Sequence, residues 1–165
     1  MGNTKGMSNM SNSIKAVMAM MVMSVFMLVG CQPATAATLP VDFTLGYTDN
    51  GVIDKEGVTA NVGTEVNNIK FGLTTFTSSD KLESYGAYAA VPIRVQGTSL
   101  TVLPTVKIED YREYSKTVGS VGLGLDFAMT DTVSLSALGM TSRSLSGSSD
   151  KLRGEVYTLG LTKRF

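Results

Sequence analysis

The 165-residue sequence contains no histidine, no tryptophan and a single cysteine. Without histidine, a Ser-His-Asp triad and any histidine-ligated metal site are impossible. Because Cys31 stands alone, the chain has no intramolecular disulfide and no cluster of thiolates that would hold a metal. Phosphate loops and metal motifs are also absent, and no pair of acids for carboxylate-only catalysis can be located from spacing alone. The sequence therefore predicts a protein without catalytic residues, cofactor or metal.

The chain also lacks an excess of either charge. Lys and Arg number 14 and Asp and Glu number 14, so nothing in the composition indicates a nucleic-acid partner. The length leaves room for one domain. No stretch after residue 37 shows an apolar repeat of helical period, which indicates an all-β fold.

The first 36 residues read as an export segment. Lys5 and Lys15 precede an apolar run from Ala16 to Val29, which is typical of a secretory signal and short for a membrane-spanning helix. Two cleavage sites compete. Leu28-Val29-Gly30-Cys31 resembles the lipobox of bacterial lipoproteins and predicts lipidation of Cys31, whereas Ala34-Thr35-Ala36 fits ordinary signal peptidase. We expect residues 1–36 to be the signal and processing region and residues 38–165 to form the mature domain.

The mature region contains eight segments in which apolar and polar residues alternate. Longer polar loops alternate with short turns between these segments, as in a meander of antiparallel strands. The segments are Val41–Thr48, Val58–Val66, Ile69–Thr77, Leu82–Val95, Leu100–Asp110, Thr117–Met129, Val133–Ser144 and Arg153–Phe165. Pro92 interrupts the fourth segment, and Leu103 with Pro104 blurs the alternation of the fifth.

The two faces of these segments differ in a way that favours a membrane barrel. Eight strands can close on themselves, and strands of about 9–11 residues match a bilayer. The face opposite the large apolar residues carries small and polar side chains, where exposed glycines would weaken a soluble sheet but a narrow lumen needs them. The glycines on that face are Gly46, Gly63, Gly72, Gly86, Gly122, Gly124, Gly154 and Gly160. The predicted fold is an eight-stranded antiparallel up-and-down transmembrane β-barrel that follows a signal peptide.

The closing segment carries the most specific resemblance. Tyr157, Leu159, Leu161 and Phe165 share one face, and they resemble the terminal signal that the barrel-assembly machinery recognises in small eight-stranded outer-membrane barrels. That group includes the OmpA transmembrane domain, OmpX and YfaZ-like proteins of Gram-negative bacteria. Lys163 departs from the pattern, and the absence of tryptophan leaves the aromatic girdle thin.

This resemblance implies a monomer in the outer membrane, in contact with membrane lipid and lipopolysaccharide and with both termini in the periplasm. The longer connections at 49–56, 78–81, 111–116 and 146–151 then face outward. A lipid on Cys31 would sit in the inner leaflet beside the first strand. Asp-Lys pairs at 54–55, 80–81 and 150–151 can bind cations together with lipopolysaccharide, although such exposed pairs are common.

Two groups of residues are candidates for function. Glu65, Lys70, Arg94 and Asp126 face the lumen near the periplasmic strand ends, where they form either a gate that opens a pore or a structural polar core. Tyr111, Arg112 and Tyr114 mix aromatic and charged side chains in an outward loop, as binding surfaces do, although loops are often polar without binding anything. Tyr47 and Tyr157 are interpreted as interfacial anchors.

The leading hypothesis is a non-enzymatic outer-membrane barrel with a structural or adhesion-type role through its outward loops. Two alternatives remain open. One is a narrow porin-like channel. The other is a lipid-anchored soluble β-barrel that binds a small apolar ligand.

Overall fold

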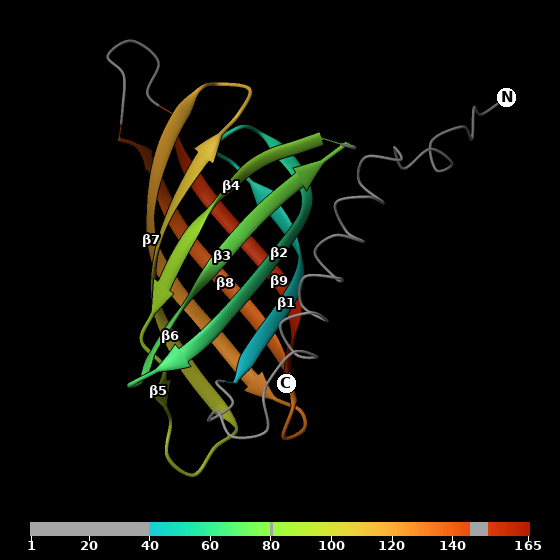
Figure 1. Cartoon of the computed structure of the whole chain (residues 1–165), viewed down its shortest axis with the longest axis vertical. Helices are drawn as coiled ribbons and strands as arrows, with labels where there is room; N and C mark the ends of the chain where they lie inside the picture. Colours follow the sequence, from blue (N-terminus) through green and yellow to red (C-terminus); the bar gives the residue numbers. More distant parts are fainter. Residues whose placement is uncertain (1–39, 80, 146–151) are drawn as a thin grey trace, which may run out of the picture. The chain divides into compact units, whose positions relative to one another are not determined.

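The computed structural model describes residues 40–79, 81–145 and 152–165, and the fold described below is the compact unit formed by residues 40–78, 82–145 and 152–165. It consists of antiparallel strands inclined to a common axis (Figure 1). The strands are β1 (Val41–Asn50), β2 (Lys55–Val66), β3 (Ile69–Ser78), β4 (Lys81–Ala90), β5 (Ile93–Arg94), β6 (Leu100–Tyr111), β7 (Lys116–Ala128), β8 (Val133–Ser144) and β9 (Arg153–Arg164). Among the described residues, no helix has the length and apolar character needed to cross a membrane.

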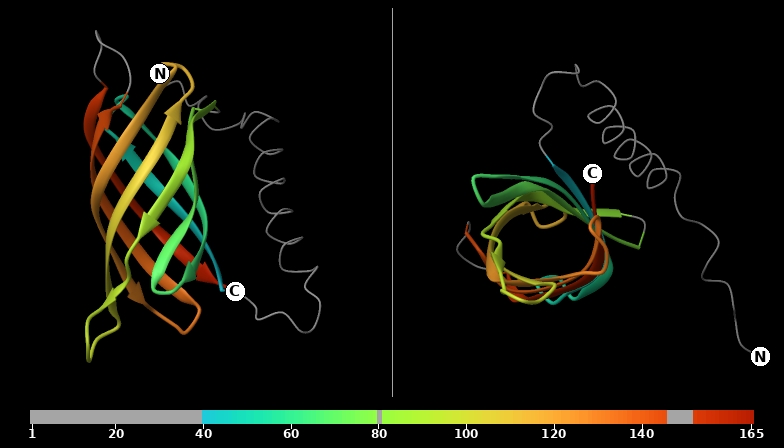
Figure 2. Two further views of the ribbon diagram at one scale, coloured as in Figure 1. Left: turned by 60° about the vertical axis from the view of Figure 1, so that its left-hand side comes forward. Right: turned by 90° about the horizontal axis from the view of Figure 1, so that it is seen from below.

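The sheet closes on itself, as the view along its axis shows (Figure 2). Neighbouring strands pair in the order β4-β3-β2-β1-β9-β8-β7-β6-β5, and β4 also pairs with β6. Because β4 and β5 both pair with β6, they share one position around the barrel. The result is an eight-stranded antiparallel barrel, so the predicted fold is confirmed.

Closure joins the first strand to the last. Leu45 lies opposite Leu161 in the β1–β9 ladder, and the backbone N–H of Phe165 donates to the carbonyl of Val41 at 2.9 Å. The barrel therefore has two distinct ends. We call the end with Val41 and Phe165 the terminus end, and the end with residues 49–56, 111–116 and 144–145 the loop end.

Proline breaks the fourth predicted segment into β4 and β5. Pro92 has no N–H to add to a ladder, so the strand stops at Ala90 and resumes at Ile93. The N–H of Val91 still donates to the carbonyl of Pro104 on β6, at 3.1 Å. In β6 the alternation is intact, since Leu103 is buried inside and Pro104 lies on the outer face.

Turn chemistry fixes the shortest hairpin. Asn67 and Asn68 have φ angles of 51° and 61° between β2 and β3. Asparagine tolerates this left-handed region, which two-residue hairpins require. This turn fills the two-residue gap between the predicted segments Val58–Val66 and Ile69–Thr77.

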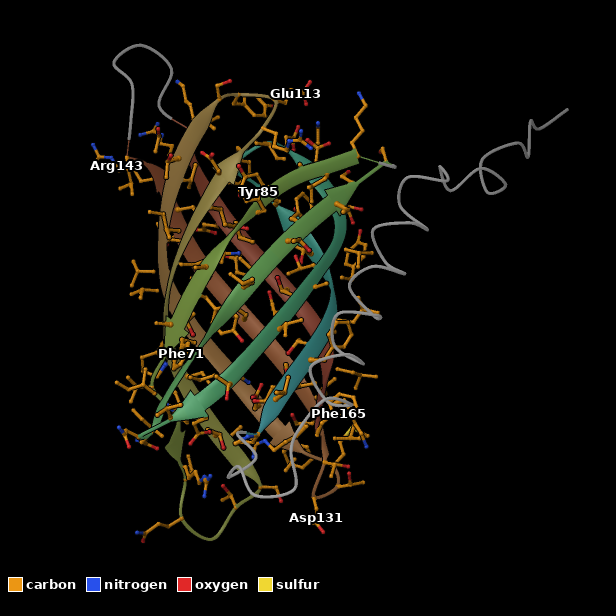
Figure 3. All side chains as sticks on the ribbon, in the orientation of Figure 1. Phe71, Tyr85, Glu113, Asp131, Arg143 and Phe165 are labelled. Carbon is orange, nitrogen blue, oxygen red and sulfur yellow. The ribbon has the colours of Figure 1, made fainter. Side chains whose placement is uncertain are left out.

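The outer wall of the barrel is apolar. Leu73 is 68% exposed and Phe165 56% exposed, and Phe71 and Tyr85, which Figure 3 labels together with Phe165, are exposed as well. Other large exposed side chains on this wall are Leu45, Tyr47, Val58, Ile69, Val106, Ile108, Val121, Leu123, Leu125, Phe127, Leu135, Tyr157, Leu159 and Leu161. An apolar band of this kind on every strand position is the signature of a transmembrane barrel.

The interior is mainly polar. Buried side chains that face the lumen include Asp42, Lys70, Lys107, Glu109 and several threonines and serines. A soluble barrel that carries an apolar ligand requires the opposite arrangement, with apolar side chains inside and charge outside. The structure therefore contradicts the soluble-barrel alternative.

Glycine makes room for an aromatic side chain in the lumen. Gly63 and Gly72 lie opposite each other on β2 and β3. A Cβ atom on Gly63 would lie 2.2 Å from the hydroxyl oxygen of Tyr88 on β4, which is far inside contact distance. The small inner face predicted from the sequence is thus filled by larger side chains from other strands.

Candidate functional site

A polar cavity of about 330 Å³ opens at the terminus end of the lumen. The four charged residues predicted to cluster all line it: Glu65 from β2, Lys70 from β3, Arg94 from β5 and Asp126 from β7. Asp42 from β1 and Arg164 from β9 line it as well. Closure of the barrel thus brings charged residues from six strands to one cavity.

Asp42 is the centre of the ion pairs in this cavity. Its side chain is only 2% exposed, and its Oδ2 lies 2.8 Å from Nζ of Lys70, which is itself buried. Its Oδ1 accepts a hydrogen bond from Nε of Arg164 at 3.0 Å. Arg164 also approaches Glu65, with 3.9 Å between Nη2 and Oε2. One carboxylate of β1 therefore pairs with two cations, Arg164 from the neighbouring β9 and Lys70 from β3 on the far side of β2.

The sequence-based prediction named neither Asp42 nor Arg164. Asp42 alternates with the outward-facing residues of β1, so it faces the lumen, and it lies opposite Arg164 in the β1–β9 register. That pair forms only because β1 and β9 lie side by side in the closed barrel. The sequence contained the information needed to predict this pair, because the first and last strands of a closed meander must be neighbours.

Arg94 and Asp126 occupy the other side of the cavity. Thr101 separates them, because it is paired with Arg94 on β5 and with Asp126 on β7. Within the part of the chain that the structure describes, neither side chain forms an ion pair. The predicted cluster thus comes together in one cavity, but its members do not pair as two acid-base couples.

Hydroxyl groups fill the middle of the lumen. The Thr162 hydroxyl lies 2.7 Å from those of Thr44 and Ser136, so it links β1, β9 and β8. The Thr48 hydroxyl links β1 to Thr59 at 2.6 Å and to Thr158 at 2.8 Å. These side chains satisfy one another where water has little room, as buried polar groups must.

A second buried ion pair lies nearer the loop end. Nζ of Lys107 is 2.9 Å from Oε2 of Glu109, and the hydroxyl of Ser84 donates to Oε1 of Glu109 at 3.0 Å. Lys107 and Glu109 are adjacent inward-facing residues of β6. The lumen therefore contains charge at two levels, and each level includes a buried ion pair between protein groups.

An apolar cap closes the loop end above this pair. Val52 and Ile53, in the connection between β1 and β2, are both buried. They pack with inward-facing residues of five strands: Phe76, Tyr111, Val118, Met140 and Val156. The turn is held by the N–H of Val52, which donates to Oδ1 of Asn50 at 3.1 Å.

The structure corrects the predicted position of Tyr111, which the sequence analysis placed in an outward loop with Arg112 and Tyr114. β6 extends to Tyr111, whose side chain is 1% exposed, and its hydroxyl accepts a hydrogen bond from Nδ2 of Asn50 at 3.0 Å. The inward alternation of β6 continues one residue beyond the predicted strand end at Asp110, so this aromatic ring enters the cap. Arg112 and Tyr114 remain exposed in the connection to β7.

Lys55 binds acids other than its sequence neighbour. Its Nζ lies 2.9 Å from Glu83 and 2.9 Å from Glu113, so it joins the start of β2 to β4 and to the β6–β7 connection. Asp54, which precedes it, has a φ of 55° in the turn. Asp80 and the pair at 150–151 lie outside the described residues, as do the export segment and Cys31.

The proposed assembly signal lies on the outer wall. Tyr157, Leu159, Leu161 and Phe165 are all exposed on the lipid-facing side. Lys163 is on the same side, and its Nζ donates to the hydroxyl of Thr132 at 3.0 Å in the β7–β8 turn. The lysine that departs from the apolar pattern therefore reaches past the apolar wall to a polar turn, as amphipathic side chains do at membrane interfaces.

Metal binding finds no support in the described residues, where no group of three potential ligands comes together.

Comparison with known proteins reveals similarity in structure only. Neither a protein-family model nor a curated protein sequence matches the chain. The outer membrane protein Ail of Yersinia pestis, whose backbone structure was determined in a phospholipid bilayer nanodisc, aligns with a TM-score of 0.50 and 14% identity over 78% of this chain and all of Ail. Neisserial surface protein A aligns with a TM-score of 0.46 and 14% identity over 76% of this chain and 95% of that protein. By its closed eight-strand topology, its apolar outer wall and its likeness to Ail, the chain has the fold of the small eight-stranded outer-membrane β-barrels.

Proposed function

We propose that the protein is a non-enzymatic component of the bacterial outer membrane that acts through the surface at its loop end and does not conduct solutes through its lumen. The observation that carries this proposal is the apolar cap over the lumen. Seven buried side chains from the β1–β2 turn and five strands fill the loop end of the barrel. Below them, charged groups are held in ion pairs with protein partners.

Three features support the proposed orientation. The connections at the loop end carry charged and aromatic side chains, with Arg112, Glu113 and Tyr114 exposed. The longest connection between consecutive strands, from β8 to β9, also belongs to the loop end. At the terminus end, Phe165, the last of the proposed signal residues, faces outward. In this proposal the barrel is exported through the secretory pathway, assembled by the barrel-assembly machinery and oriented with its loop end toward the medium.

The test combines membrane extraction with electrical recording. The purified folded protein should require detergent for release from outer membranes and should migrate faster on a gel before boiling than after it. In planar bilayers it should give no conductance steps. Because the protein has no tryptophan, circular dichroism is the suitable check that the silent sample is folded.

The channel alternative makes the opposite electrical prediction. Reproducible ion-selective steps from a folded, heat-modifiable sample would show that the cap and the ion pairs of Asp42 and Glu109 rearrange to open a pore. That result would replace the proposed function with a narrow channel. Release of the protein without detergent would contradict both.

A further inference from the structure

Two arginines lie directly opposite each other on the outer wall near the loop end. Arg143 on β8 is paired with Arg153 on β9, and both are exposed. Figure 3 shows Arg143 at the outer side of the barrel. Like charges at opposed positions destabilise a strand pair. Among the described residues, no acid forms an ion pair with either one. The next outward residue of β9, Glu155, accepts a hydrogen bond from the hydroxyl of Tyr157, so we consider an external anion as the partner of the two arginines.

The height of the arginines relative to the apolar wall indicates where that anion lies. Tyr157 faces outward on β9, and tyrosine rings of this kind lie at the level of lipid headgroups. Arg153 is four residues nearer the loop end, or roughly 13 Å along the strand and less along the barrel axis because the strands tilt. The guanidinium groups therefore lie just beyond the hydrocarbon, where lipid phosphates are found.

A shallow apolar groove of about 370 Å³ lies on the same strands, closer to the middle of the wall. Its floor is formed by Ala137 and Gly139 of β8, which are small residues between larger ones on both sides. Its walls are mainly apolar and aromatic, with Asp49 as the one charged residue among the described residues that line it. They comprise Leu123 and Leu125 of β7, Tyr157 and Leu159 of β9, and Tyr47 and Asp49 of β1. A groove of this size and lining fits an acyl chain, and it runs beneath the arginine pair.

We propose that Arg143 and Arg153 together bind a phosphate of lipid A, the membrane anchor of lipopolysaccharide, while one acyl chain of the same molecule lies in the groove over Ala137 and Gly139. Arginine suits this role because its planar guanidinium donates two parallel hydrogen bonds to phosphate. The inference rests on the proposed outer-membrane placement with the loop end outward. It adds a defined lipid site to that placement.

The test uses the purified full-length barrel in detergent micelles, with bound lipid counted by native mass spectrometry. The probes are diphosphoryl lipid A, dephosphorylated lipid A and phosphatidylglycerol. The wild type should retain one diphosphoryl lipid A, and binding should fall at least about tenfold for the Arg143→Gln/Arg153→Gln variant, because two charge-assisted contacts are lost. Dephosphorylated lipid A should bind the wild type as weakly as that variant binds diphosphoryl lipid A.

Control variants distinguish binding at this site from nonspecific attraction between basic side chains and anionic lipid. Lys81→Gln with Lys163→Gln removes the same charge from two exposed lysines that do not line the groove, and it should leave binding unchanged. Gly139→Ile fills the groove and should weaken binding with both arginines present. Ala87→Ile, on the exposed face of β4, is its control.

Three results would overturn the inference: equal losses in the two charge variants, equal retention of phosphatidylglycerol and lipid A, or no effect of Gly139→Ile. None of these results would contradict the proposed function, because the protein would still be a heat-modifiable membrane barrel. Loss of the proposed function itself would appear separately, as a protein released without detergent.

Discussion

At the scale of single residues, Asp42 determines whether the terminus end of the lumen is electrically balanced. It is buried and faces two cations, Lys70 at 2.8 Å and Arg164 at 3.0 Å. The two cations differ in whether they have another anion or solvent to compensate their charge when Asp42 is removed. Arg164 is 46% exposed and also approaches Glu65, whereas the buried Lys70 has Asp42 as its ion-pair partner in the described structure.

We expect Asp42→Asn to lower the free energy of unfolding by about 3 kcal/mol, because it leaves the ammonium group of Lys70 buried without an anion. Urea unfolding in lipid vesicles, followed by circular dichroism, measures this change. Glu65→Gln is the matched control. Its partner is 3.9 Å away and half exposed, so its effect should stay below about 1 kcal/mol.

A second variant tests the cause. Adding Lys70→Met to Asp42→Asn removes the stranded charge and should recover most of the lost stability, since an apolar replacement of a buried pair is often nearly neutral. If the single and double variants unfold at the same urea concentration, the burial of an unpaired Lys70 is not what destabilises the barrel.

At the scale of elements, the β1–β2 connection acts as part of the core although it is a loop. Two of its four residues, Val52 and Ile53, turn inward and pack against Phe76 and the ring of Tyr111. The interior of the barrel is thereby divided into an apolar loop end and a polar terminus end. The charged group next to the cap, Glu109, is paired with Lys107 at 2.9 Å.

Ile53→Ala should therefore lower the free energy of unfolding by about 2 kcal/mol, through lost contacts and an unfilled space in the cap. Ile108→Ala makes the same chemical change at an outward position that is 49% exposed. Lipid or detergent tails fill the space there, so its effect should be smaller than about 1 kcal/mol. Similar midpoints for the two variants in urea would show that the cap contributes nothing beyond an ordinary wall position.

At the scale of the whole molecule, stability and assembly depend on closing the chain ends. β1 and β9 pair along nine residues, and the N–H of Phe165 extends this ladder to the carbonyl of Val41. An unclosed sheet would leave both edges unpaired in a hydrocarbon environment, where each unsatisfied backbone group costs several kcal/mol. The barrel therefore forms as one unit.

Deleting Phe165 should reduce the fraction of protein that reaches the folded, heat-modifiable form in cells more than it changes the urea midpoint of the protein that does fold. The reason is that the terminal aromatic residue is proposed to be read during assembly. Phe127→Ala, which removes a phenylalanine that is 52% exposed on the same wall, serves as the control. Normal insertion of the truncated chain would refute this role of Phe165.

The alternation of residue types was sufficient to predict most of the wall. Val121, Leu123, Leu125 and Phe127 were expected on one face of their strand and Asp126 on the other, and the structure has this arrangement. Tyr111 was misplaced because a strand continues as long as its ladder continues, and the partner strand decides where that is. Its ladder reaches Lys116 on β7 and Ser84 on β4, which no local pattern in residues 109–116 indicates.

What the sequence by itself determined is the number of strands, the face of each residue and the apolar outer wall, because a period of two within one strand is a local property. What only the tertiary structure decided is which residues meet across the lumen. The pairing of Asp42 with Lys70 and Arg164, the entry of Val52 and Ile53 into the cap, and the opposition of Arg143 to Arg153 all depend on strand register and closure. These are set by interactions over the whole barrel, since a shift of one strand relative to the next changes every cross-strand neighbour at once.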